Sequence, residues 1–484
     1  MGPNSAHIIR MSIILLNSLA CFGCGQSNPP NLTPSISTHP PTVRPSLPIP
    51  SPNEWKPAPP PSFTKEVGNT FPIAEAPTTS LPKFDAQALR QAGISKHEGK
   101  YITLLTDNPA PEMAALPGVF DRAVEEWRKY LGVKETKWQV QAHVMTKRET
   151  FVSNKLWRDE LTEMKNGFAF PDALWLMDQP QAEYYRRHLL LHEGVHAFML
   201  AHFQDCGPPW YMEGMAELLA THQDDGQSHI ARYFPRNTDE TPHWGRIKLV
   251  KDDLAVGKQL SIPQILDFPP QAHLQNRTYG WCWALAAWLD AHPRYQARFR
   301  QLSAQANAAD FNDQFRTLFQ ADQASLAEEW QLFLHRLDYG DDIAREAIDF
   351  RPGQSSVAPG QPQTITIQAA RGWQSSGLLV EAGTIYHITA QGRYQIAHTS
   401  KPWPCEPNGV SLRYYQGQPL GLLLAAVQSD FTSLDQTSGL LRPVPIGLQA
   451  TFTPTTSGTL YFRVNDSSSG LHDNSGELQV TITR

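Results

Sequence analysis

The sequence has little positive charge, and it contains no long hydrophobic run. Lys and Arg number 41 against 47 Asp and Glu, which gives a formal net charge of −6. Proteins that bind nucleic acid usually carry a basic patch or a high pI, so this balance argues against nucleic acid as a partner. No apolar stretch reaches the roughly 20 residues that a membrane-spanning helix needs, which argues against a polytopic membrane protein.

Cysteine is also scarce. Five are present, Cys21, Cys24, Cys206, Cys282 and Cys405. If the first two belong to an export signal, three remain, and an odd number allows at most one disulfide. Cys206 and Cys282 could pair in an exported protein, but this cysteine density is far below that of a disulfide scaffold. We therefore favour free, buried thiols.

Residues 1–27 have the pattern of an export signal. His7 and Arg10 precede a short apolar run that ends at Ala20, and this run suits the core of a secretory signal rather than a membrane span. A small residue directly before Cys21 resembles a bacterial lipobox, although the position three residues before that cysteine holds Ser where the pattern prefers Leu. The resemblance implies a lipid anchor and a place in the cell envelope. A plain signal peptide or a later start are the alternatives.

Proline is concentrated in the segment 28–83. Sixteen of the chain's 40 prolines lie there. Such a segment lacks backbone donors for helix or sheet and extends as polyproline II, so it would serve as a semi-rigid stalk. An unstructured tail without a spacer role is the alternative.

The region 84–350 has the pattern of an α+β domain. Alternating or apolar runs predict strands over 101–106, 138–145 and 173–177. Helical periodicity predicts helices over 112–131, 183–201, 277–292, 294–305 and 324–337. Strands first and helices afterwards are typical of the α+β class.

A change of period marks the C-terminal part. A Pro, Gly and Ser-rich linker is expected over 351–362, and from residue 363 to 484 the apolar residues recur every second position. Strands are predicted over 364–368, 378–380, 385–389, 460–464 and 478–482, with turn residues between them. This pattern is typical of an all-β sandwich.

The chemistry is concentrated in one helical stretch. His192 and His196 are the two histidines of an H-E-x-x-H motif. Residues four apart share one helical face, so two imidazoles can bind one tetrahedral Zn²⁺, and Glu193 can act as general base toward water. The alternative to a metal site is a pair of solvated histidines on a helix.

A second helix is expected to supply further groups. After a Pro-Pro break, Glu213 follows His196 by seventeen residues, and a helix–turn–helix would return it opposite the histidines as a third ligand. Three protein ligands leave one position open, as in catalytic zinc sites. Glu217 lies one turn further and could accept the other N–H of a metal-binding imidazole.

The segment H-E-x-x-H followed by Trp-x-x-Glu-Gly-x-Ala-Glu resembles the gluzincin metallopeptidases, and within them the peptidase-MA-like, DUF1570-type family of bacterial proteins. The resemblance implies a thermolysin-like catalytic domain with His192, His196 and Glu213 as zinc ligands. It also implies Glu193 as base and Glu217 as the partner of His192. The strand 173–177 would be the edge strand that pairs with an extended peptide substrate.

Tyr279 and His188, near the motif, each have two possible roles. The resemblance implies that Tyr279 stabilises the oxyanion, while a structural Tyr at the head of a Trp-rich helix is its rival. His188 lies one turn before His192, and we expect it to pack or to form a hydrogen bond rather than to bind metal. The exopeptidase motif Gly-x-Met-Glu-Asn is missing upstream of His192, which leaves endo- or exo-action open.

The sandwich has an oxygen-rich loop of its own. Asp466, Asp473 and Asn474 lie between two predicted strands, and such oxygen clusters suit Ca²⁺. The segment 363–484 resembles the galactose-binding-like sandwich of the PA-I lectin type, which implies calcium and a glycan at these three residues. An Asx-rich turn that closes a hairpin is the alternative.

These observations favour an exported zinc peptidase with an accessory glycan- or Ca²⁺-binding module. Its partner would be a peptide or protein substrate, possible glycans would bind the sandwich, and membrane contact would come only through a lipid anchor. A surface carbohydrate-binding protein with an inactive peptidase-like scaffold is the second hypothesis, and a zinc-storage protein or zinc sensor is the third. The intact set of Glu193, both histidines and Glu213 argues against the second.

Overall fold

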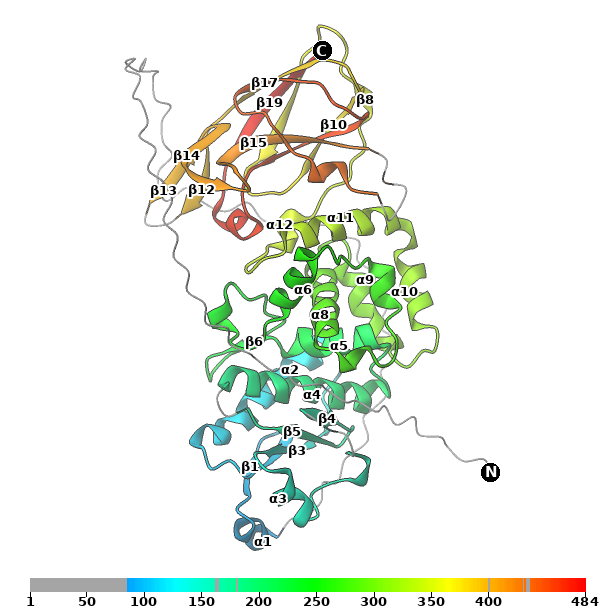
Figure 1. The fold of residues 1–484 in the computed structure, drawn as a ribbon, viewed down its shortest axis with the longest axis vertical. Coiled ribbons are helices and arrows are strands. Elements are labelled where there is room, and N and C mark those ends of the chain that lie inside the picture. Colours follow the sequence, from blue (N-terminus) through cyan, green and yellow to red (C-terminus); the bar gives the residue numbers. More distant parts are fainter. Residues whose placement is uncertain are drawn as a thin grey trace.

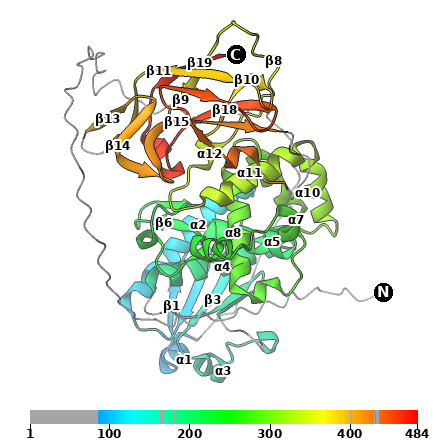
Figure 2. The same ribbon diagram turned by 45° about the horizontal axis from the view of Figure 1, so that its top comes forward.

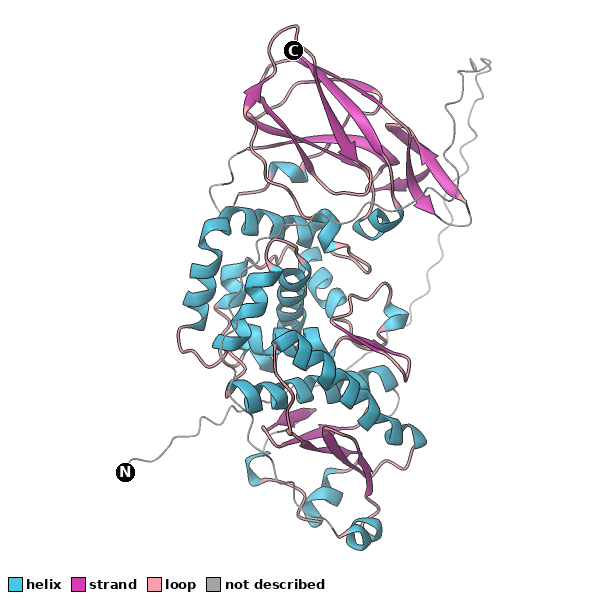
Figure 3. Cartoon of the chain, turned by 180° about the vertical axis from the view of Figure 1, so that it is seen from behind, coloured by secondary structure: helices cyan, strands magenta, loops and turns pink. Residues whose placement is uncertain are grey.

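The computed structural model describes residues 85–161, 164, 166–179, 182–398, 401–429, 431 and 436–484. The expected export signal (1–27) and Pro-rich segment (28–83) lie outside the described residues. Along the long axis, a small sheet at one end is followed by a helical layer and then by a sheet-rich C-terminal region (Figure 1). Helices fill the middle, strands fill the C-terminal end, and the small sheet near the other end has short helices beyond it (Figure 3). The expectation of an α+β fold with a sheet-rich C-terminal region is thus confirmed.

The first sheet has five strands in the order β1-β2-β3-β5-β4. Their bounds are β1 Ser95–Glu98, β2 Ile102–Thr106, β3 Val140–Met145, β4 Gly167–Ala169 and β5 Ala173–Met177. The central strands β2, β3 and β5 run parallel, and both outer strands are antiparallel to their neighbours. The helices α2 and α4 cross this sheet (Figure 2).

The prediction that 173–177 forms the edge strand is wrong. This segment is β5, which pairs with β3 on one side and with β4 on the other. The chain turns back at residues 170–172, so the three-residue strand β4 takes the outer position.

Twelve α-helices are found in the described part of the chain. They are α1 Ala86–Gln91, α2 Leu116–Leu131, α3 Arg148–Ser153, α4 Glu183–Phe203, α5 Pro209–Ala220, α6 Arg246–Ala255, α7 Ile262–Leu266, α8 Asn276–Ala291, α9 Gln296–Gln301, α10 Phe311–Phe319, α11 Gln323–Arg336 and α12 Ile343–Glu346. A short hairpin, β6 His222–Asp224 and β7 His229–Ala231, follows α5.

Helix α4 lies between the first sheet and the helical layer. Nearly every residue from Leu189 onward is buried, including the polar ones, because α2, α5 and strands of the sheet pack around it. Its close approach to α2 depends on Gly194. A Cβ at that position would lie 2.5 Å from a ring carbon of Phe120 and 3.0 Å from the Trp127 ring. A helix that is buried on all sides needs such small residues where its neighbours cross.

The C-terminal strands form two main sheets. Their orders are β14-β15-β18-β10-β8, with β16 beside β15, and β17-β11-β19-β9, while β12 and β13 pair separately. The bounds are β8 Ser355–Ser356, β9 Gln363–Gln368, β10 Gln374–Val380, β11 Tyr386–Gln391, β12 Tyr394–His398, β13 Pro402–Cys405, β14 Asn408–Tyr415, β15 Gln418–Gln428, β16 Val444–Pro445, β17 Gln449–Phe452, β18 Gly458–Val464 and β19 Glu477–Thr483. Strand β8 lies within the expected linker 351–362 and pairs in parallel with β10, so this segment contributes to the sheet.

The sandwich packs on the helical layer through β15. Leu423, Ala425 and Val427 face the sandwich core. The intervening Leu422 and Leu424 join an apolar cluster that also contains residues of α11 and the segment after α12. A buried ion pair of Arg463 on β18 with Glu346 on α12, at 3.0 Å, adds a polar contact at the same interface.

The remaining cysteines Cys206, Cys282 and Cys405 are free and buried, which confirms the favoured interpretation. Among the described helices, none combines the length and apolar character needed to cross a membrane.

The tight contact at Gly194 leads to a stability prediction. Gly194→Ala should lower the free energy of unfolding by about 1–3 kcal/mol, because the added methyl group overpacks the contact with Phe120. The sign of this change in the free energy of unfolding tests the contact, since Ala in an open helix interior stabilises by about 1 kcal/mol relative to Gly. Denaturant unfolding measures the difference.

Gly118→Ala in α2 is the matched control. Only the flexible end of Arg122 lies near that position, at 3.3 Å, so its stability should be equal to or above that of the wild type. Equal stability gains for both variants would contradict the packing of α2 on α4.

Candidate metal centre

A turn between α4 and α5 brings the predicted ligands together. Gln204 and Gly207 have φ values of 68° and 81°, and left-handed residues of this kind end one helix and redirect the chain. Pro209 is the first residue of α5, where its missing N–H costs nothing. The two helices therefore pack side by side and place Glu213 opposite His192 and His196.

The three candidate ligand atoms form a nearly equilateral triangle. His192 Nε2 lies 3.2 Å from His196 Nε2 and 3.2 Å from Glu213 Oε2, and His196 Nε2 lies 3.6 Å from the same oxygen. In a tetrahedral zinc site with bonds of about 2.0–2.1 Å, ligand atoms lie about 3.3 Å apart. The triangle therefore has the size that one Zn²⁺ requires.

The chemistry of the donors agrees with the geometry. All three side chains are buried, and the two imidazole nitrogens lie next to each other and next to one carboxylate oxygen of Glu213. In the neutral form that binds metal, both nitrogens would direct a lone pair at the centre of the triangle, where a cation would accept them. Both oxygens of Glu193 are also buried and lack a hydrogen-bond partner within the described ranges. The residues therefore fit a divalent metal ion.

Several pKa values at this site are shifted. Burial opposes charge on His192, but its contacts with Glu213 and Glu217 outweigh burial and raise its pKa well above the ordinary value. Burial likewise opposes charge on Glu213, yet the two imidazoles hold its pKa at about 2. Burial raises the pKa of Glu193 to about 8.

Glu193 lies beside the outer strand of the sheet. A Cβ at Gly167 of β4 would clash with the Glu193 carboxylate. The backbone of this strand therefore passes directly against the candidate base. Because β4 is the last strand of the sheet, its outer backbone edge has no strand partner in the described residues. The small residue at position 167 is the sequence signal that could have identified this strand.

Tyr279 reaches the site from α8. Helices α5 and α8 approach closely at Gly214, where a Cβ would lie 2.9 Å from Cys282 O. The Tyr279 ring lies 5.9 Å from the His192 ring. Burial and the nearby carboxylates raise the pKa of Tyr279 well above its usual value, so its hydroxyl keeps its proton.

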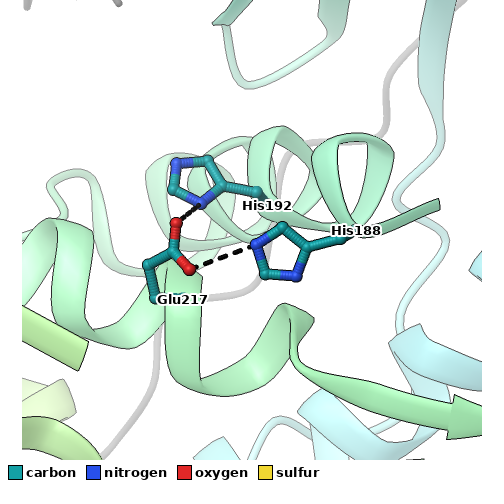
Figure 4. Close-up of side chains that lie close together, drawn as sticks. All are labelled: His188, His192 and Glu217. Carbon is teal, nitrogen blue, oxygen red and sulfur yellow. Dashed lines mark hydrogen bonds and ion pairs between the residues drawn. The ribbon is translucent and has the colours of Figure 1, made fainter. Parts of the chain in front are cut away.

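Glu217 lies behind His192, away from the ligand triangle. Its Oε1 is 3.3 Å from His192 Nδ1, and its Oε2 is 3.1 Å from His188 Nε2 (Figure 4). His188 therefore contacts Glu217 and does not join the triangle of His192, His196 and Glu213. Sequence reasoning did not identify two further partners of Glu217, Trp244 and Arg246, since no motif spacing links them to α5.

The loop of the sandwich brings together only part of its predicted set. Asn474 Nδ2 donates to Asp466 Oδ2 at 2.9 Å, whereas Asp473 accepts from the backbone N–H of His398. Burial raises the pKa of Asp466 to about 6. Three buried oxygens near this loop lack a hydrogen-bond partner in the described part of the chain, namely Asn474 Oδ1, Ser475 Oγ and Gln395 Oε1.

Comparisons with known proteins give distant structural neighbours only. No protein-family model matches the chain, and no curated protein matches it. Among solved structures, the "EclA N-terminal domain; PllA-like lectin" matches at a TM-score of 0.20 and 20% identity, over 25% of this chain and 94% of that one. The "IMPa metallopeptidase from Pseudomonas aeruginosa" matches at 0.16 and 14%, over 52% of this chain and 24% of that one. A structure of IMPa with an O-glycopeptide matches at the same TM-score and identity.

These TM-scores and identities are low. At these values the similarity establishes nothing about the function of this chain.

The shifted pKa values lead to a prediction about metal binding. A metal ion must replace the proton on His192 and favours the ionised form of Glu193, so binding should release protons at neutral pH. Zinc affinity should therefore fall as the pH is lowered from about 8 to about 6. Calorimetry in buffers of different ionisation enthalpy measures both effects. An affinity that is flat over this range, with no proton release, would contradict a protonated His192 in the metal-free site.

Proposed function

We propose that this protein is a zinc-dependent peptidase that hydrolyses peptide bonds. The ligand triangle of His192, His196 and Glu213 is the observation that carries the proposal, because its dimensions match one tetrahedral zinc ion. Three protein ligands are the number that a catalytic site uses, since one position is left for water or substrate. Export to the cell envelope through a signal and lipid anchor is part of the same proposal and rests on residues 1–27.

The residues around the triangle have complementary roles. Zn²⁺ would supply Lewis acidity, which polarises a scissile carbonyl and lowers the pKa of attacking water. Glu193 takes a proton from the attacking water and passes it to the leaving amine. Tyr279, held protonated, donates a hydrogen bond from its hydroxyl to the developing oxyanion.

Strand β4 gives the substrate a place to bind. An extended peptide can add to an exposed sheet edge through main-chain hydrogen bonds. A peptide paired with the outer edge of β4 would pass Glu193, because the backbone at Gly167 lies against that carboxylate. Strand β4, Gly167–Ala169, therefore replaces 173–177 as the strand proposed to pair with an extended peptide substrate.

The peptidase proposal makes a sharp prediction for Glu193→Gln. The amide has nearly the same shape but cannot accept the proton, so peptide hydrolysis should fall by about 10²–10⁴-fold. Zinc content should stay that of the wild type, because Glu193 is not a ligand. A peptide-library digest followed by mass spectrometry, with elemental analysis of the same samples, measures both. Cleavage by Glu193→Gln at the wild-type rate would rule out the proposed base.

A second candidate function concerns the sandwich. The buried Asp466 carboxylate, with the unpartnered oxygen of its neighbour Asn474, favours an oxygen-ligated cation such as Ca²⁺. A bound glycan, and the alternative of a carbohydrate-binding protein with an inactive scaffold, would depend on this loop.

Calcium should raise the thermal unfolding temperature of the full chain, and Asp466→Asn should abolish the shift. The full chain is required because β15 and Tyr461 would lose their apolar contacts in an isolated sandwich. Calcium at 100 times its dissociation constant would stabilise the fold by about 2.7 kcal/mol. An identical unfolding temperature with calcium or with chelator would remove the calcium proposal, and a glycan array on the same protein tests sugar binding independently.

A further inference from the structure

The buried carboxylate of Glu217 is surrounded by four nitrogen atoms, two from α4, one from the turn before α6 and one from α6. Oε2 lies 3.1 Å from His188 Nε2 and 3.2 Å from Trp244 Nε1. Oε1 lies 2.7 Å from a terminal nitrogen of Arg246 and 3.3 Å from His192 Nδ1. Each carboxylate oxygen thus faces two nitrogens, and the group has little freedom to rotate.

These partners are themselves held in place. His188 comes from α4, one turn before His192 (Figure 4). Its second nitrogen lies 3.2 Å from Ala220 O. Arg246 is the first residue of α6, follows the left-handed Gly245, and donates its other terminal nitrogen to Trp244 O at 3.0 Å. The guanidinium is buried, so its pairing with the carboxylate is shielded from water.

The same atoms also form a group that could in principle hold a second metal ion. His188, His192 and Glu217 offer three ligand atoms within 4.8 Å of one another. A cation bound there would lie beside the Arg246 guanidinium and would displace the N–H groups that already occupy the carboxylate. Charge repulsion and the filled carboxylate therefore exclude a second metal and leave this group a supporting role.

We propose that Arg246 and His188 are positioning residues for the metal centre. They fix the Glu217 carboxylate so that His192 directs its Nδ1–H toward Glu217 and its Nε2 lone pair toward His196 and Glu213. The proposal rests on the metal site proposed above and deepens it. Groups that hold a metal-binding imidazole in this way typically change metal affinity by 10–100-fold.

Arg246 also contacts the other side of the site. Its guanidinium carbon lies 5.5 Å from the centre of the Tyr279 ring. One cation thus packs against both the carboxylate behind His192 and the residue proposed to bind the oxyanion. Loss of Arg246 should therefore reduce kcat as well as zinc affinity.

The test measures zinc affinity by competition with a chelator, using the purified protein and zinc alone. Arg246→Met should weaken zinc binding by about 10–100-fold, while the stoichiometry at saturating metal stays one per chain. Arg246→Lys should recover most of the affinity, because it restores a cation beside Glu217. In the zinc-loaded wild type, the Nδ1–H proton of His192 should give an NMR signal protected from exchange, and Arg246→Met should lose it.

Arg122→Met is the matched control. It breaks an arginine–carboxylate pair with Asp224 in the same helical layer, so it should reduce stability and leave zinc affinity unchanged. Equal zinc affinity in Arg246→Met and the wild type would overturn the positioning role while leaving the metal site intact. A wild type that binds no zinc would overturn both proposals.

His188 provides a second pair of variants in case Arg246→Met fails to fold. His188→Leu removes the nitrogen beside Glu217, whereas His188→Gln keeps an N–H donor. Weaker zinc binding in His188→Leu with recovery in His188→Gln supports the proposal. Equal and undiminished affinity in the two variants contradicts it.

Discussion

The structure depends on holding two imidazoles and three carboxylates together in a buried helical core, namely His192, His196, Glu193, Glu213 and Glu217. Buried charges of this kind persist only when they are paired or bound to a metal, because burial strongly disfavours isolated charge. The α4–α5 turn brings the candidate ligand triangle together. Glycines at the crossings let α2 and α8 approach, and Gly167 lets the sheet reach Glu193.

The site is built around α4. The candidate ligand triangle lies at its centre, and behind it Glu217 on α5 contacts both His192 on α4 and Arg246 on α6. Strand β4 lies on one side with an unpaired edge, and Tyr279 lies on the other. In the proposed peptidase, α4 would supply two metal ligands and the base, so the geometry that the proposed hydrolysis needs would be in place before substrate binds. The sandwich is joined to this body by an apolar interface and by the Arg463–Glu346 pair.

The sequence allowed the local parts of this arrangement to be predicted. A spacing of four residues places His192 and His196 on one helical face, and the Pro-Pro break predicts the turn before Glu213. Sheet order is not local, so the outer strand was assigned to 173–177 although β4 takes that position. Strand β15 was not predicted because both of its faces are buried, one in the sandwich and one against the helices, which removes the alternation that marks a strand. Arg246 was missed because its link to Glu217 exists only in three dimensions.

The most direct test of this account is the zinc content of the purified protein, measured by elemental analysis alongside His192→Ala and Glu213→Ala. The account predicts about one zinc per chain in the wild type, because three protein ligands form one tetrahedral site, and strongly reduced zinc in both variants. Far-ultraviolet circular dichroism of the variants controls for their fold. A folded wild type that contains no zinc, even after incubation with the metal, would contradict the central claim.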